Sequence, residues 1–231
     1  MEAGAGIHAT QRQRRRLGPW LSALGLCAAL AIGTGVGAGL HTLLSRHAAA
    51  AVAAAPSTGL YGQASWPSGA RPAPAIRSLR DQSGRGFALS SLRGRTVAIA
   101  FFDSYCTQEC PLEGRELAAA EQSLAAAQRP VLVVVSVNPR DTPASTRAAA
   151  RRWGLAQVAA WHWLRGSHAQ LARVWRAYQI AVAPPHDGDI AHTEALYLVD
   201  RRGDERSGYL YPFASRFVTL DLRTLAREPA S

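Results

Sequence analysis

Two of the three cysteines of this 231-residue chain, Cys106 and Cys110, lie four residues apart. They follow an apolar run over residues 96–102, which predicts a buried strand, and precede a helical pattern over residues 112–127. Thiolates at a strand-to-helix junction can bind a soft metal or form a disulfide, and a helix N-terminus lowers the pKa of a thiol. The residues alone leave open which chemistry the pair performs.

The spacing of the two cysteines suits either chemistry. Residues i and i+4 of a helix share a face, with β-carbons about 5–6 Å apart, so we expect both sulfurs on one side of the helix. That separation fits one small ion between the sulfurs, or a disulfide after a small adjustment. A purely stabilising disulfide is the weaker interpretation, because closing so short a loop removes little chain entropy. Glu109 beside the pair partly opposes thiolate formation.

Four histidines in the same part of the chain are candidate third ligands. His162 lies between two tryptophans, which indicates packing, and His168 begins a predicted helix, which indicates a surface or capping role. His186 and His192 share one loop before the predicted strand at residues 195–199. Spacing alone does not choose between these two.

The elements around these residues predict one α/β domain over residues 76–228, a length that fits one core. We expect central strands that run largely parallel, with the site beyond their carboxyl ends, where Cys106 falls. The expected elements are a hairpin over 76–89, strands over 97–102, 131–137, 195–199 and 208–211, and helices over 112–127, 143–153, 168–178 and 213–225. Thr142 and Ser167 are expected to cap the second and third helices.

The N-terminal part predicts a single-pass membrane anchor. Residues 1–16 form a basic cytoplasmic arm, and residues 17–45 are an uncharged stretch longer than the roughly 7–15 residues of a signal-peptide core. The positive-inside rule then places the domain on the extracytoplasmic side, periplasmic or cell-surface. A cleaved signal is the alternative, since residues 53–55 are all alanine, and residues 46–75 are expected to be a flexible linker.

The net charge of +10 is uneven, because the first 80 residues carry +7 of it. A nucleic-acid-binding domain concentrates positive charge on itself, so we expect no nucleic-acid partner. A basic arm beside a membrane segment explains the charge better.

Four motifs in order resemble one known family. The segment over residues 76–102 resembles the opening of thioredoxin-like redoxin domains, and Phe-Phe-Asp-Ser-Tyr-Cys-Thr-Gln-Glu-Cys-Pro over 101–111 resembles the Cys-x-x-x-Cys-Pro motif of the SCO/SenC family. Ser-Val-Asn-Pro-Arg-Asp-Thr-Pro over 136–143, the helix region over 163–178 and Ala-His-Thr-Glu-Ala-Leu-Tyr-Leu-Val-Asp over 191–200 are similar to the family's later motifs. The match spans nearly the whole predicted domain.

This resemblance implies a thioredoxin-like domain with a central mixed sheet and a copper site made by Cys106, Cys110 and His192. It selects His192 over His186 because His192 aligns with the family histidine. It further implies a membrane-anchored copper chaperone that delivers copper to the binuclear centre of cytochrome c oxidase subunit II. The chain departs from the family pattern at Thr107, Gln108 and Ala191, and its Asn-Pro loop is one residue shorter.

Two other functions stay open. A thiol–disulfide reductase would use Cys106 as the attacking thiolate and Cys110 as the resolving thiol, with His192 tuning the thiolate. This enzymatic activity and copper transfer can coexist. The two cysteines are separated by one residue more than in the Cys-x-x-Cys motif of common thioredoxin-like reductases, which favours copper binding. A tethered interaction domain without chemistry is disfavoured by the intact cysteine and histidine set, and zinc is compatible with the ligands by softness alone.

Overall fold

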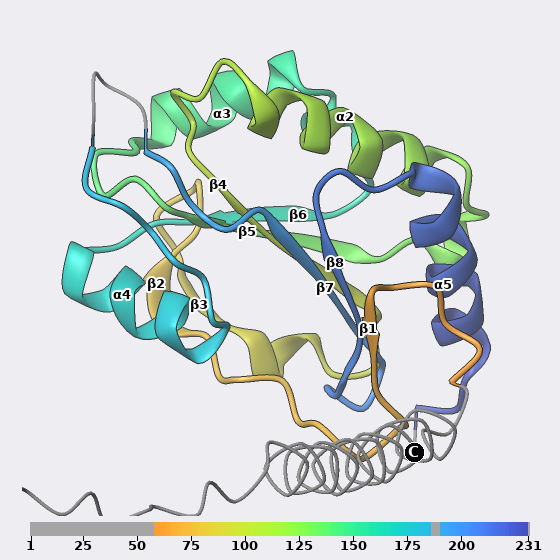
Figure 1. The fold of residues 1–231 in the computed structure, drawn as a ribbon. Coiled ribbons are helices and arrows are strands. Elements are labelled where there is room, and N and C mark those ends of the chain that lie inside the picture. Colours follow the sequence, from red (N-terminus) through yellow and green to blue (C-terminus); the bar gives the residue numbers. More distant parts are fainter. Residues whose placement is uncertain (1–57, 186–189, 231) are drawn as a thin grey trace, which may run out of the picture. The chain divides into compact units, whose positions relative to one another are not determined.

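A computed structural model of the chain describes residues 58–185 and 190–230. Its strands alternate with helices around one six-stranded sheet and a separate two-stranded hairpin (Figure 1). The strands are β1 (Ala64–Ser65), β2 (Arg77–Arg80), β3 (Gly86–Ala88), β4 (Val97–Phe102), β5 (Val131–Ser136), β6 (Trp161–Leu164), β7 (Ala195–Val199) and β8 (Glu205–Leu210). The helices are α2 (Glu109–Gln122), α3 (Pro143–Arg152), α4 (His168–Ala177) and α5 (Ser215–Arg227), with short 3₁₀ turns at Leu89–Leu92, Ala126–Gln128 and Leu155–Gln157.

The central sheet is mixed, with the strand order β1-β8-β7-β4-β5-β6. Strands β4, β5 and β6 run parallel, while β7 and β8 are antiparallel additions beside β4. The mixed sheet expected from the family resemblance is therefore confirmed, and only its β4–β6 half is parallel. The antiparallel arrangement matters because β7 begins at the edge of the sheet where β4 and β5 end.

Both faces of the sheet are covered, which explains the continuous apolar runs of its central strands. Alternate residues of β4 pack into two different cores, one on each face of the sheet. On one face, α2, α3 and α5 cover Ala98, Ala100 and Phe102. Ile99 and Phe101 pack on the other side against α4 and the β2–β3 hairpin. Every residue of β4 and β5 is buried, as expected for strands between two helical layers.

The strongly patterned elements form where the sequence predicts them. Strands β4 and β7 match residue for residue, and Thr142 and Ser167 each close a capping box at the start of α3 and α4. Strand β6 is absent from the sequence-based prediction. It has four residues at the sheet edge, a length at which alternation is too short to recognise.

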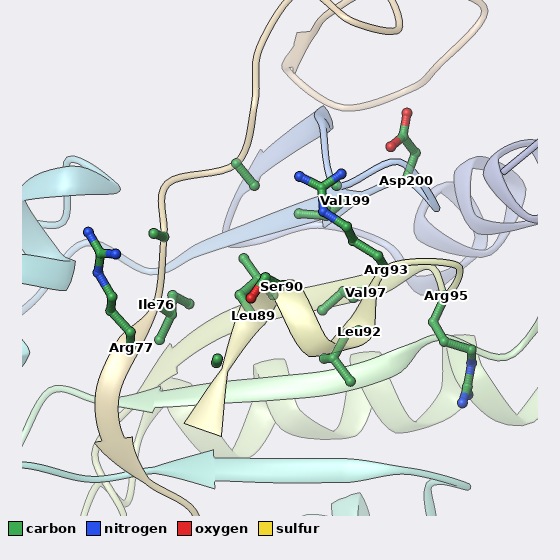
Figure 2. Close-up of a pocket in the computed structure, with 14 residues that line it drawn as sticks. Ile76, Arg77, Leu89, Ser90, Leu92, Arg93, Arg95, Val97, Val199 and Asp200 are labelled. Atoms are coloured by element: carbon green, nitrogen blue, oxygen red, sulfur yellow. The ribbon is translucent and has the colours of Figure 1, made fainter. Parts of the chain in front are cut away.

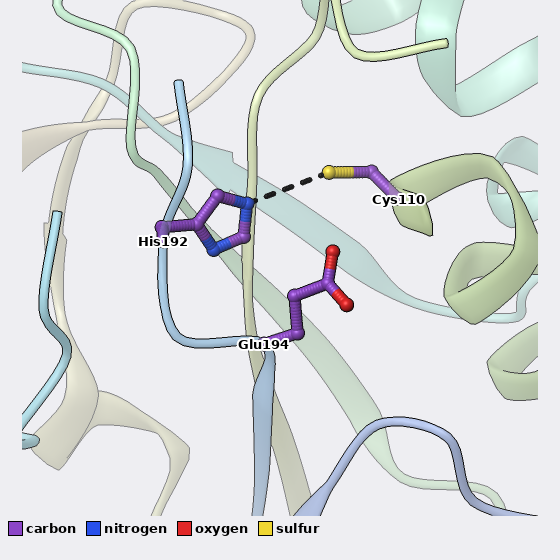
Figure 3. A group of neighbouring side chains, drawn as sticks. All are labelled: Cys110, His192 and Glu194. Atoms are coloured by element: carbon purple, nitrogen blue, oxygen red, sulfur yellow. Dashed lines mark hydrogen bonds between the residues drawn. The ribbon is translucent and has the colours of Figure 1, made fainter. Parts of the chain in front are cut away.

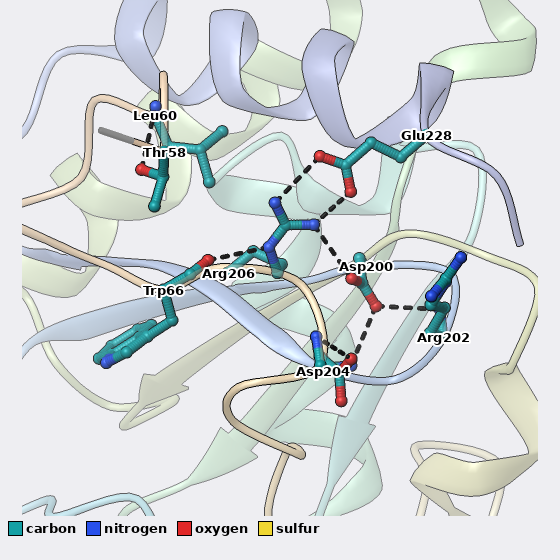
Figure 4. A network of polar contacts seen from close by, with 9 residues as sticks. Thr58, Leu60, Trp66, Asp200, Arg202, Asp204, Arg206 and Glu228 are labelled. Atoms are coloured by element: carbon teal, nitrogen blue, oxygen red, sulfur yellow. Dashed lines mark hydrogen bonds and ion pairs between the residues drawn. The ribbon is translucent and has the colours of Figure 1, made fainter. Parts of the chain in front are cut away.

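The segment before residue 76 differs from the flexible linker expected there. Strand β1 pairs with β8, and Arg71 forms an ion pair with the fully buried Glu205. Arg206, itself buried, donates to the carbonyl of Trp66 at 3.0 Å and contacts Asp200 and Glu228 (Figure 4). Residues 58–75 therefore pack as part of the domain, because buried charges of β8 take their partners from them.

None of the helices in the described part of the chain is long and apolar enough to cross a membrane. The predicted basic arm and anchor, residues 1–45, lie outside the described residues, and so do residues 46–57 of the predicted linker. The anchor stays a prediction.

Candidate functional site

Three loops meet at one edge of the sheet. Cys106 and Cys110 follow the end of β4, Asn138 and Asp141 follow the end of the parallel strand β5, and His192 precedes the antiparallel strand β7. The register pairs Phe102 with Ser136 and Ala100 with Leu196, which brings these ends side by side. Cys110 and His192, 82 residues apart in sequence, thus contribute side chains to one site.

The two cysteines do not share a helix, which corrects the expected arrangement. Helix α2 begins at Glu109, three residues before the predicted start, so Cys110 lies in its first turn. Cys106 lies in the preceding turn, where its amide donates to the carbonyl of Asp103 at 3.1 Å. The turn at the end of β4, rather than an i,i+4 helical face, therefore places the sulfurs together.

The two thiols have opposite acidities. A hydrogen bond from the Cys110 thiol lowers the pKa of Cys106 to about 6, and the backbone amides of Gln108 and Cys110 add to this effect. The same hydrogen bond, together with burial, raises the pKa of Cys110. Cys106 is half-buried and Cys110 is fully buried. The pair is therefore one accessible thiolate and one buried thiol that stabilises it, as expected for amides at a helix N-terminus.

His192 lies against the buried thiol of this pair, with its Nε2 atom 3.6 Å from the sulfur of Cys110 (Figure 3). Its Nδ1 atom is 3.1 Å from the carbonyl oxygen of Thr193, which only accepts hydrogen bonds, so Nδ1 carries the proton. Burial lowers the pKa of His192, so the ring is neutral at pH 7. Its Nε2 lone pair therefore points toward the Cys110 sulfur and is available to a metal or to a thiol proton.

Two glutamates at the site were missed by the sequence analysis. Atoms of Cys110, His192 and Glu194 that can bind a metal all lie within 4.8 Å of one another. Burial raises the pKa of Glu194 to about 7. Glu113, one turn after Cys110 on α2, is fully buried, its carboxyl oxygens have no hydrogen-bond partner in the described structure, and burial raises its pKa well above the ordinary value. Alternation along the strand from His192 could have predicted Glu194; no comparable pattern marks Glu113.

The loop after β5 holds the thiol turn in place. Asn138 donates from Nδ2 to the Asp103 carboxylate at 3.0 Å, and the Ser104 hydroxyl donates to Asp141 at 2.6 Å. All four side chains are buried. Burial raises the pKa of Asp141 to about 6, against hydrogen bonds from Ser104 and Ser136 that lower it. The motif over residues 136–143 therefore supports the site from behind and supplies no ligand.

A pocket of about 350 Å³ opens over the site and is lined by Cys106, His192 and Glu194 together with Gln108, Glu109, Ile190 and Ala191. A second cavity, of about 270 Å³, lies at the opposite end of β4 between Val97, Leu89 and Arg93 (Figure 2). The described lining of that cavity contains no thiol or imidazole, so the chemistry belongs to the first pocket.

The remaining histidines do not join the site. His162 lies in β6 and packs on Phe87 with a ring separation of 5.1 Å, and His168 begins α4 with its edge against Trp175. Both placements confirm the expected packing and surface roles. His186 lies outside the described residues.

A thiol pair at the carboxyl edge of a mixed sheet, with both faces of the sheet covered, defines a thioredoxin-like domain. The SCO1/SenC family profile matches residues 77–227, and the chain belongs to that family. No curated protein matches the chain significantly.

Solved structures show the same fold. ScoI of Bradyrhizobium japonicum, solved with copper bound, is 26% identical over 67% of this chain and 99% of its own, with a TM-score of 0.55. A SCO1/SenC family lipoprotein from Bacillus anthracis is 21% identical over 68% of this chain and 96% of its own, with a TM-score of 0.61. BsSco, described as having a disulfide switch and as a Sco-family cytochrome c oxidase assembly protein, is 19% identical over 69% and 95%, with a TM-score of 0.56.

Proposed function

We propose that this domain binds copper through Cys106, Cys110 and His192 and delivers it to the binuclear copper centre of cytochrome c oxidase subunit II. The observation that carries the proposal is the 3.6 Å separation between His192 Nε2 and Cys110 Sγ, two atoms whose residues lie 82 positions apart. Chain folding has placed an unprotonated imidazole nitrogen beside the sulfur of Cys110.

The donor set fits copper. Thiolates and imidazole are soft or borderline ligands, and Cu(I) accepts few of them. Cys106 is already a thiolate near pH 7, and the Nδ1 hydrogen bond to Thr193 fixes the ring of His192 with Nε2 free. Metal binding then has to displace only the proton of Cys110.

Transfer to a client needs an open side. Cys106 is half-buried and lines the pocket over the site, beside the exposed Gln108 and Glu109. A client thiol entering there would replace one ligand at a time. Copper bound to the Bradyrhizobium japonicum protein and the assembly role described for BsSco support this function by likeness.

The test is Cu(I) binding by the purified full chain, measured by competition with a chromogenic chelator under anaerobic conditions. We expect one Cu(I) per chain, and a loss of affinity of at least about tenfold in each of Cys106→Ala, Cys110→Ala and His192→Ala, because each change removes one of only three ligands. His168→Ala is the matched control, since it removes an exposed imidazole on α4. Equal affinity in all five proteins would contradict the proposal.

A second candidate function, thiol–disulfide reduction, is favoured by the opposite acidities of the thiols. The Cys106 thiolate would attack a client disulfide and form a mixed disulfide, releasing one client thiolate that takes up a proton. Cys110, after losing its proton, would then attack Cys106, release the second client thiol and leave the Cys106–Cys110 pair oxidised. Metal-free wild-type protein should reduce a disulfide substrate. The Cys110→Ala variant should be trapped as the mixed disulfide, and the His192→Ala variant should remain active. Failure to trap that species would exclude this route.

We also propose that residues 17–45 anchor the chain once in the membrane, with the domain extracytoplasmic. An anchor keeps the domain near a membrane-bound client and raises its effective concentration there. Membrane fractionation with protease added from the outer side should leave only the N-terminal arm protected. A wholly soluble chain, or a domain that resists the protease in intact cells and is cut after lysis, would contradict the anchor or its orientation.

A further inference from the structure

Glu194 has a carboxylate at the candidate copper site without a described role. The ligand atoms of Glu194, His192 and Cys110 lie within 4.8 Å of one another, and Figure 3 shows the carboxylate pointing to the side where the sulfur and the ring meet. Glu194 also lines the same pocket as Cys106. The Glu194 oxygen thus lies close to two of the proposed copper ligands, Cys110 and His192, and shares a pocket with the third, Cys106, which lies outside that cluster.

The backbone explains why Glu194 faces the thiols. Thr193 is tied to the opposite side, where its amide donates to the carbonyl of Ala181 at 2.9 Å and its hydroxyl accepts from the amide of Ala181 at 3.1 Å. In extended chain, residues on either side of such an anchor point the other way. His192 and Glu194 therefore project together toward Cys110, and the amide of Tyr211 fixes the carbonyl of Glu194 at 3.0 Å.

The Glu194 carboxylate is available to bind a ligand. Within residues 58–185 and 190–230 it has no hydrogen-bond or ion-pair partner, although Glu194 is half-buried. A half-buried carboxylate without a partner carries a desolvation cost, which a cation in the pocket would offset. Among the described residues that line the pocket, there is no arginine that could do so.

The two copper oxidation states differ in what they need from such a group. Cu(I) is satisfied by two thiolates and an imidazole, whereas Cu(II) prefers a tetragonal arrangement with nitrogen and oxygen donors. We propose that Glu194 supplies a fourth, oxygen ligand that is used by Cu(II) and dispensable for Cu(I). This inference rests on the proposed copper site and adds a residue and an oxidation-state preference to it.

The test compares Glu194→Gln with wild type in the full chain. The variant keeps the shape of the side chain and removes the anionic donor. We expect Cu(II) affinity to fall at least about tenfold, the electron paramagnetic resonance and thiolate-to-Cu(II) absorption spectra to change, and Cu(I) affinity to stay within about threefold. A tenfold loss for Cu(II) alone corresponds to a rise of about 59 mV in the copper reduction potential.

Glu109→Gln is the matched control, because Glu109 is a glutamate that lines the same pocket but lies outside the ligand cluster. Its Cu(II) spectra should match wild type. The inference is overturned if Glu194→Gln retains wild-type Cu(II) affinity and spectra, if it loses Cu(I) and Cu(II) equally, or if Glu109→Gln has the same effect. Absence of copper binding by wild type, or unchanged binding in His192→Ala, would instead overturn the proposed copper site itself.

Discussion

At the scale of single residues, the two thiols differ in acidity because one hydrogen bond links the half-buried sulfur of Cys106 to the buried sulfur of Cys110. The donor, Cys110, holds its proton, and the acceptor, Cys106, gives its proton up. Either function proposed above starts from this state, since a thiolate is both the metal ligand and the nucleophile.

The first prediction concerns the acidity of Cys106. In metal-free reduced protein, the alkylation rate of Cys106 should rise with a midpoint near pH 6, the pKa set chiefly by the hydrogen bond from Cys110. Cys110→Ala removes that donor and should move the midpoint upward toward the ordinary thiol value of about 8.5. The rate is measured with iodoacetamide across pH 5–10. An identical midpoint in the variant would show that Cys110 does not set it.

The second prediction concerns the buried Glu113. Burial raises its pKa in the folded protein, so between pH 4.5, its ordinary value, and that raised pKa the folded state binds more protons than the unfolded state. Stability from this group is therefore complete below pH 4.5 and lost as pH rises. A tenfold difference in proton affinity between the folded and unfolded states corresponds to about 1.4 kcal/mol of unfolding free energy. The Glu113→Gln substitution should reduce the loss of unfolding free energy that occurs as pH rises.

The measurement is denaturant unfolding of wild type and Glu113→Gln from pH 4 to pH 8. The other acids whose pKa is raised, Glu194, Asp141 and Glu205, are present in both proteins, so the difference between the two curves reports on Glu113. The difference should favour the variant increasingly with pH. Parallel curves would mean that Glu113 titrates normally.

At the scale of elements, the site exists because three connections end at one sheet edge and are tied to each other. The loop after β5 contacts the turn after β4 through Asn138 and Asp103, and Asp141 and Ser104 make a second contact. The loop before β7 is held by the bridge between Val182 and His192. The turns that carry the proposed copper ligands are thus held in place by residues that are not themselves ligands.

The third prediction tests this support. Asn138→Ala removes the 3.0 Å hydrogen bond to Asp103 and leaves a buried carboxylate oxygen with fewer partners. Loss of such a bond costs about 1–3 kcal/mol, and the loosened turn should also weaken copper binding. Thermal unfolding and Cu(I) competition measure the two effects. Gln128→Ala, on a short turn away from the site, is the control. Unchanged stability and affinity in Asn138→Ala would assign the loop no supporting role.

At the scale of the whole molecule, residues 58–75 complete the domain at the edge of the sheet distant from β6. They add β1 beside β8 and place Arg71 on Glu205, whose side chain is fully buried. Burial raises the pKa of Glu205, and the Arg71 contact opposes that rise. The ion pair therefore couples the entry segment to the sheet.

The fourth prediction follows from this coupling. Arg71→Ala leaves Glu205 buried without its cation and should lower the free energy of unfolding by roughly 2–3 kcal/mol at pH 7. The double variant Arg71→Ala with Glu205→Gln should recover part of the loss, because the uncompensated charge is gone. Chemical denaturation at pH 7 compares the three proteins. An Arg71→Ala variant as stable as wild type would mean that the entry segment does not support the sheet.

The sequence by itself determined the elements whose hydrophobic pattern is long and whose caps are local. Local sequence patterns predict strands β4 and β7 and the helix caps at Thr142 and Ser167, because each of these features depends on residues that are neighbours in the chain. It also determined, through the motif resemblance, that His192 is the histidine to consider with Cys106 and Cys110. Short β6, the true start of α2 and the pairing of β1 required the fold, because each depends on partners distant in the chain.

Only the tertiary structure decided what the site contains besides those three residues. The antiparallel β7 brings Glu194 to the thiols, α2 buries Glu113 beneath them, and the loop after β5 supplies Asn138 as a support. The acidities of the two cysteines likewise depend on which sulfur is buried. Burial and through-space contact set these properties, and neither is encoded in the spacing of residues along the chain.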